Sequence, residues 1–190
     1  LIGRVVPVKD VKAFIRSVAI LKERMGDVQA LIIGPADEDP DYLKECQVLV
    51  NYQNLDDNVS FTGKVKVVEY LPKIDLVVFS GICVAQPLVV LEAGAAGVPV
   101  VSTDVGACHE MILGPEWEDP PLGEGGVIVP PANPSALAQG MYTLLTDRSR
   151  YDQCSKNLRE RVMTYYHKKD QHEAYRELYH TYLDKSKGQG

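Results

Sequence analysis

The 190-residue sequence lacks the features that mark several common classes of protein. Its formal net charge of -6 gives no overall basic field, so nucleic acid is not an expected partner. No apolar run is long enough to cross a membrane, and no signal peptide opens the chain. We therefore expect a cytoplasmic protein with no integral membrane segment.

Closely spaced metal-binding or redox residues are also missing. The four cysteines are Cys46, Cys83, Cys108 and Cys154. None belongs to a C-x-x-C pair, which disfavours a zinc ribbon or a redox pair and favours free thiols. The histidines near the C-terminus are His167, His172 and His180. They have no cysteine or carboxylate cluster beside them, so we expect them to face solvent and expect no metal site.

The common nucleotide and nucleophile motifs do not occur either. The first apolar segment leads into residues 4–9, Arg-Val-Val-Pro-Val-Lys, and not into G-x-G-x-x-G. There is no Walker A loop and no G-x-S-x-G. These absences disfavour a dehydrogenase, a P-loop ATPase and an α/β-hydrolase.

Short apolar segments alternate with helical ones along the chain, a pattern typical of an α/β fold with a parallel sheet covered on both faces. The expected strands, about six in one sheet, are residues 2–6, 28–33, 59–62, 75–80, 98–102 and 127–129. The expected helices are residues 11–25, 41–55, 69–71, 87–96, 109–113, 134–145, 150–166 and 170–183. Residues 114–126 are expected to form a surface loop, and residues 186–190 a disordered tail.

Ligands of open parallel sheets bind beyond the carboxyl ends of the strands, which directs attention to the segments that follow them. The first such segment carries Gly3, Arg4 and Lys9. Arg4 offers a planar fork of donors and Lys9 a compact charge, so the two could neutralise a diphosphate. The alternative is that both are ordinary solvated surface charges.

A second segment begins at Gln86 and Pro87 and continues as an apolar helix. Proline suits the first turn of a helix, whose free N–H groups bind phosphate readily. Glu92 lies four residues after Leu88 and shares its face, where its carboxylate could accept hydrogen bonds from a ribose diol. The alternative for Glu92 is a buried ion pair with a neighbouring cation.

The third segment, residues 103–110, contains a glycine and a histidine. Gly106 permits a tight turn and the close approach of backbone to a ligand. His109 is expected at the surface, because a lone histidine is more often exposed than catalytic.

Taken together, these segments resemble the family 4 retaining glycosyltransferases, which have the GT-B fold of two facing Rossmann-like domains. Residues 3–10 resemble the family's G-R-x-x-x-x-K-G/D phosphate motif, and residues 91–101, LEAGAAGVPVV, resemble its L-E-A-x-A-x-G-x-P-V-V motif. Residues 102–106 match the turn that follows. Residues 4–12 and 85–89 further resemble the members of the family that act in Pel exopolysaccharide synthesis.

The resemblance implies a role for each matching position. Arg4 and Lys9 would bind the donor diphosphate and carry the catalysis. The implied donor-binding residues are Gly3, Lys64, Val65, Gln86, Leu88, Val89 and Glu92. Among these, Glu92 would bind the ribose, the N–H groups at positions 88 and 89 would touch phosphate, and the backbone at positions 64 and 65 would hold the base.

The resemblance also implies the wider setting. Residues 1–185 would be the donor-binding domain, one half of a GT-B fold, cut from a longer protein whose acceptor-binding domain precedes Leu1. The partners would be a nucleotide sugar, expected to be a UDP-sugar, and a glycan acceptor bound by the other domain. The transfer would retain stereochemistry and need no metal or other cofactor. Such an enzyme could also work at the inner face of the membrane.

One position departs from the family pattern. The family has a glutamate eight residues before the one matched by Glu92, and it normally contacts the transferred sugar. This chain has Val84 there. Two alternatives therefore accompany the glycosyltransferase interpretation: a non-catalytic module that binds sugar nucleotides, and a GT-B sugar-nucleotide epimerase.

Overall fold

The computed structural model describes the backbone of residues 1–187 and the side-chain exposure of residues 1–182. The strands are β1 (Ala30–Ile33), β2 (Val59–Gly63), β3 (Val77–Phe79), β4 (Val100–Thr103) and β5 (Gly126–Val129). The α-helices are α1 (Val11–Met25), α2 (Pro40–Tyr52), α3 (Leu88–Ala96), α4 (Cys108–Leu113), α5 (Pro134–Thr146), α6 (Arg148–Tyr165) and α7 (Lys168–Lys187). Three single-turn 3-10 helices are η1 (Pro7–Lys9), η2 (Val67–Glu69) and η3 (Leu71–Lys73).

The strands form two parallel sheets, in the orders β1-β2 and β3-β4-β5. Between them, the start of the chain contributes a single parallel bridge from Ile2 to Ile33. The α/β class with parallel strands is therefore confirmed, whereas the expectation of about six strands in one sheet is wrong. The hydrogen-bonded ladder is interrupted between β1 and β3, where the chain forms only the Ile2–Ile33 bridge.

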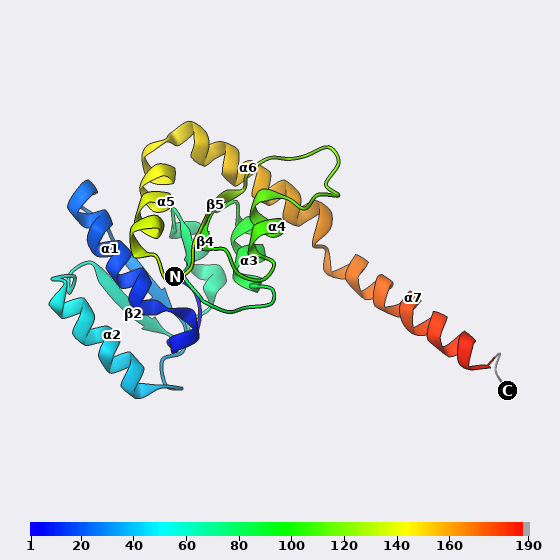
Figure 1. The fold of residues 1–190 in the computed structure, drawn as a ribbon, viewed down its shortest axis with the longest axis horizontal. Coiled ribbons are helices and arrows are strands. Elements are labelled where there is room, and N and C mark those ends of the chain that lie inside the picture. Colours follow the sequence, from blue (N-terminus) through cyan, green and yellow to red (C-terminus); the bar gives the residue numbers. More distant parts are fainter. Residues whose placement is uncertain (188–190) are drawn as a thin grey trace.

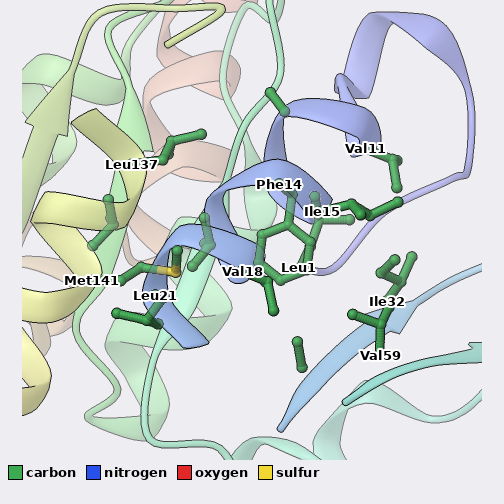
Figure 2. Packing of buried hydrophobic residues seen from close by; sticks show 14 of the residues in the cluster. Leu1, Val11, Phe14, Ile15, Val18, Leu21, Ile32, Val59, Leu137 and Met141 are labelled. Carbon is green, nitrogen blue, oxygen red and sulfur yellow. The ribbon is translucent and has the colours of Figure 1, made fainter. Parts of the chain in front are cut away.

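The helices cover both faces of the strands, and Figure 1 shows α1 and α5 on a different side from α3 and α4. Consecutive residues of β3 and β4 belong to separate hydrophobic clusters, because successive side chains of a strand point to opposite faces. Val78 and Val101 pack with α1 and α5, while Val77 and Val100 pack with α3, α4 and α6. Figure 2 shows the first cluster, in which Phe14 lies close to Val18 and Leu1.

The strand expected at residues 2–6 is wrong: only Ile2 forms a bridge to a strand, and residues 3–6 are not in a strand. After Gly3 the chain bends, and the N–H of Val6 donates to the carbonyl of Arg4 at 3.1 Å. Pro7 then begins a 3-10 turn, because proline lacks the N–H that a strand ladder would need. The turn carries Lys9 to the start of α1, where the carboxylate of Asp10 caps the helix as expected, accepting from the N–H of Ala13 at 3.2 Å.

The expected surface loop at residues 114–126 contains a buried ion pair that the composition did not reveal. Arg161 of α6 is 0% exposed, and its Nε donates to Oε1 of Glu118 at 2.6 Å. The same guanidinium donates to the carbonyls of Ile112 at 2.8 Å and Gly123 at 2.6 Å. The loop is therefore fastened to α6, and the guanidinium is held by two carbonyls as well as by a carboxylate.

The remaining helix boundaries differ from the expected ones by a few residues at most, except near the C-terminus. Helix α7 projects away from the rest of the fold (Figure 1) and runs to Lys187, so the expected tail is wrong at residues 186 and 187. Residues 188–190 lie outside the described part of the chain. Over residues 1–187, no helix has both the length and the apolar character needed to span a bilayer.

Candidate functional site

The turn that carries Lys9 packs directly against the carboxyl end of β3. The hydroxyl of Ser80 donates to the carbonyls of Lys9 at 2.9 Å and Asp10 at 3.1 Å. The N–H of Ile82 donates to the carbonyl of Val8 at 3.0 Å. The ammonium of Lys9 lies 5.1 Å from the centre of the Phe79 ring. The structure thus joins two of the segments that the sequence predicts to meet.

The loop after β3 is joined in turn to the end of β4. The Thr103 hydroxyl donates to the carbonyl of Gly81 at 2.6 Å. Further along, the N–H of Ala107 donates to the carbonyl of Ala85 at 2.8 Å. Gly106 makes this contact possible, because a Cβ built there would lie 2.0 Å from the carbonyl oxygen of Val84. The tight turn predicted at this glycine is confirmed by its φ of 53°, and the predicted approach of its backbone to a ligand stays a prediction.

Helix α3 begins at the end of this same loop. Pro87 is its buried N-cap residue, and its carbonyl accepts from the N–H of Val90 at 3.0 Å. The N–H groups of Leu88 and Val89 belong to the first turn, whose donors have no acceptor within a helix. They therefore give this end of α3 a partial positive charge.

Glu92 lies one turn along α3 from Leu88, and both side chains are exposed. The alternative of a buried ion pair is therefore wrong for Glu92: within the described residues it forms no salt bridge. Gln86, also exposed, precedes the helix. An exposed carboxylate on the face of Leu88 is free to accept hydrogen bonds from a ligand at the helix start.

Arg4 has a partner that the sequence did not suggest. Its guanidinium contacts both carboxylate oxygens of Glu38 at 2.6 Å, and the two side chains are about half exposed. The loop after β1 reaches Arg4 because Gly34 has no side chain: a Cβ there would lie 2.1 Å from the carbonyl oxygen of Gly3. No pattern in the sequence distinguishes Glu38 from the neighbouring acids.

Lys64 and Val65 follow the carboxyl end of β2, at the far side of the β1–β2 pair. Lys64 is exposed and Val65 is half-buried. Their link to the other segments runs through the loop after β1, where the N–H of Gly34 donates to the carbonyl of Gly63 at 3.1 Å. These residues thus belong to the same carboxyl edge of the strands as Lys9.

The histidines and cysteines lie in the environments that the sequence predicts. His109 is exposed, with its Nδ1 3.6 Å from Asp104, and the three C-terminal histidines are exposed as well. The four cysteines are free thiols. Over the described residues, no group of three or more potential metal-binding side chains comes together.

Comparison with known proteins gives a consistent result. A family model described as "Glycosyl transferases group 1" matches residues 1–147. The capsular polysaccharide biosynthesis glycosyltransferase CapM of Staphylococcus aureus is 26% identical over 194 residues, which cover 98% of this chain and 47% of CapM. The chain spans less than half the length of the curated relatives it matches.

Solved structures share the fold. The C-terminal domain of a group 1 glycosyl transferase, LpcC, from Francisella tularensis superposes with a TM-score of 0.75 and 26% identity, covering 87% of this chain and 84% of that domain. Anabaena HepE, solved with UDP, superposes with a TM-score of 0.74 and 22% identity, covering 85% of this chain and 42% of HepE. The Rossmann-like half of a GT-B fold expected from the sequence is thereby confirmed.

Proposed function

Because the chain belongs to the group 1 glycosyl transferases, we propose that it is the nucleotide-sugar-binding domain of a family 4, retaining enzyme. The donor would be a UDP-sugar, and its hexose would pass to a glycan acceptor during polysaccharide biosynthesis. One observation carries the proposal: the turn bearing Lys9 packs on the loop that leads into α3, so a cation and a helix N-terminus belong to the same edge of the fold.

The names of similar proteins support the choice of substrate class. HepE was solved with UDP, and CapM is named for capsular polysaccharide biosynthesis. The acceptor side of the reaction would come from the part of the protein outside this chain, since transfer requires both substrates to be held in one geometry. Membership of the Pel subgroup stays a prediction.

The proposed chemistry places positive charge where the leaving diphosphate develops negative charge. Lys9 would supply a point charge and Arg4 a bidentate fork of donors to the diphosphate. The N–H groups of Leu88 and Val89 would donate to phosphate oxygens at the start of α3. With two cations and a helix N-terminus available, the proposal needs no metal ion or other cofactor.

Arg4 can take this role only by leaving Glu38. Their ion pair is about half exposed, and exposed pairs contribute about 0–1 kcal/mol. A diphosphate carries more charge than one carboxylate and can therefore displace Glu38. Glu92 would accept from the ribose hydroxyls, while Gly3, Gln86 and the backbone at residues 64 and 65 would complete the donor site.

Isothermal titration calorimetry of the chain with UDP, GDP and ADP tests the proposal. We expect weak binding of UDP and weaker binding of the other two. Absence of heat with all three nucleotides would refute the donor-domain proposal. A preference for GDP or ADP would refute only the assignment of the base.

A non-catalytic binding module is the second candidate, because Val84 stands where the family has a sugar-contacting glutamate. Val84 is half-buried, and its carbonyl packs against Gly106. In the full-length protein, Val84→Glu should alter the rate of sugar transfer or the sugar preference, with little change in UDP affinity. A protein that binds UDP but transfers no sugar would favour the second candidate.

A further inference from the structure

The ion pair between Arg4 and Glu38 occupies one of the two cations of the candidate site. Only Nη1 of Arg4 takes part, and it donates to both carboxylate oxygens of Glu38 at 2.6 Å. The side chains are 52% and 51% exposed, and among the residues that the structure describes neither has another hydrogen-bonding partner. A contact through one nitrogen lacks the two parallel hydrogen bonds that make an arginine fork strong. The pair is therefore accessible to ligands and open to exchange.

The backbone around this pair is fixed on both sides. The N–H of Val5 donates to the carbonyl of Pro35 at 2.9 Å, which ties the segment that carries the arginine to the loop after β1. At the other end of that loop, Asp39 caps α2 by accepting from the N–H of Tyr42 at 3.0 Å. The glutamate directly precedes this cap. Exchange of partners therefore requires rotation of two exposed side chains and no rearrangement of the loop.

The glutamate belongs to a run of acids at the start of α2. Residues 37, 38, 39 and 41 are all aspartate or glutamate. Over the part of the chain that the structure describes, Arg4 is the only cation that forms a salt bridge with any of them. A phosphate bound to Arg4 would lie next to this run, and like charges repel. The run therefore attracts the arginine when no phosphate is present and opposes a phosphate that takes its place.

We propose that Glu38 is an internal competitor of the donor diphosphate, and so a residue that sets the affinity and the release rate of the nucleotide. In the free protein its carboxylate holds Arg4. A diphosphate displaces this carboxylate, which takes Arg4 back as UDP leaves. The inference rests on the proposed function, because it requires a phosphate that binds Arg4. It adds a residue that acts against binding to the residues that act for it.

Competition of this kind has a defined size and a defined specificity. Every ligand that uses Arg4 must overcome the free energy of the pair, and exposed pairs contribute little, so the affinity for UDP should be lowered by about two- to fivefold. Uridine has no phosphate and does not require Arg4, so its affinity should not depend on Glu38. Because affinity differences between related complexes lie mainly in the dissociation rate, the competitor should speed the release of UDP by a similar factor. Faster release of UDP raises turnover wherever product release limits the rate.

Glu38→Gln tests the proposal, with Asp37→Asn as the matched control. Both substitutions exchange a carboxylate for an amide in the same acidic run, and both residues are exposed, but Asp37 forms no salt bridge with Arg4. Calorimetry should show that Glu38→Gln binds UDP about two- to fivefold more tightly than Asp37→Asn does, whereas the two variants bind uridine equally. Phosphorus NMR line shapes of UDP should give a dissociation rate that is lower in Glu38→Gln by a similar factor.

The possible outcomes separate the competitor role from the donor-domain proposal. Equal UDP affinities in the two variants would overturn the competitor role and leave the donor-domain proposal intact. Weaker UDP binding by Glu38→Gln would also overturn it, because Glu38 would then orient Arg4 for phosphate. A gain of equal size with uridine would overturn it too, since the effect would not depend on phosphate. No binding of UDP by the parent or by either variant would refute both proposals.

Discussion

The hydroxyl of Ser80 donates to the backbone carbonyl of Lys9 at 2.9 Å, across 71 positions of sequence. This bond fixes the turn after Gly3 on the carboxyl end of β3. The ammonium of Lys9 is consequently held over the ring of Phe79, beside the loop that leads to α3.

We expect Lys9→Met to weaken UDP binding by about 1.5–3 kcal/mol, or roughly 10- to 100-fold, because a charge-assisted contact to phosphate is lost. Binding of uridine should not change. Methionine keeps most of the apolar part of the lysine side chain, which packs beside Gly3: a Cβ built on Gly3 would lie 3.8 Å from it. Calorimetry with both ligands measures the difference.

Lys12→Met is the matched control, since Lys12 pairs with Glu45 of α2 and lies over the Tyr42 ring. It should leave both affinities unchanged. If Lys9→Met reduced the affinities for UDP and uridine equally, Lys9 would act through the fold and not through phosphate.

Glu92→Gln should weaken UDP binding roughly 10-fold or more while leaving the Tm within about 1–2 °C of the parent. The side chain is exposed, so the change leaves no buried charge without a partner. Titration with 2′,3′-dideoxy-UDP provides the control, because this ligand lacks the ribose diol. An equal loss of affinity for both nucleotides would contradict the ribose role.

The sequence predicted the class of fold because its apolar segments are short, alternate with helices and end at glycine, proline or polar residues. It also predicted which loops meet, since the carboxyl ends of parallel strands share one edge. It missed the point at which the chain leaves the sheet after Gly3, although Pro7 could have indicated the end of that strand.

Two long-range ion pairs were equally inaccessible from the sequence. Glu38 and Glu118 resemble the acids around them, and only the folded chain brings them to Arg4 and Arg161. For Glu92 the sequence allowed either a contact with the ribose or a buried ion pair. Helical spacing shows that Glu92 lies on the same face of the helix as Leu88, but it does not show whether that face is exposed. The structure decides between them, and the ribose contact remains a prediction.

Gly106→Ala should destabilise the fold more than Gly26→Ala and should abolish most of the UDP affinity. Both glycines have positive φ, at 53° and 80°, so each substitution brings backbone strain of about 1–3 kcal/mol. A Cβ at Gly26 meets nothing within 4 Å, whereas one at Gly106 overlaps the carbonyls of Val84 and Ala85. Urea unfolding and UDP titration of both variants isolate the effect of this overlap. Unchanged UDP affinity in Gly106→Ala would show that the loop does not shape the donor site.

Arg161→Met should destabilise the fold by about 3–5 kcal/mol, because it leaves the buried Glu118 carboxylate without its partner. The double variant Arg161→Met with Glu118→Leu should recover most of this loss. Urea unfolding at pH 7 measures both. If the double variant were no more stable than Arg161→Met alone, the cost would come from the lost carbonyl contacts of the guanidinium.

The same pair predicts how stability depends on pH. Hydrogen bonds from Arg161 lower the pKa of Glu118 below its ordinary value of 4.5. Below about pH 4.5 the unfolded carboxylate binds a proton while the folded one stays ionised, so the free energy of unfolding decreases as pH falls through the folded pKa. Glu118→Gln should flatten this part of the pH profile.

Cys83 lies in the loop after β3, next to Val84, and is exposed, while the other three thiols are buried. Burial raises the pKa of Cys46 to about 11 and also raises the pKa values of Cys108 and Cys154, which keeps these thiols protonated and unreactive. A thiol-reactive dye would therefore attach at Cys83 without any engineered cysteine. Placed beside the loop that leads to α3, the dye becomes an optical reporter, and a change in its emission on mixing with UDP would give the rate at which donor arrives and leaves.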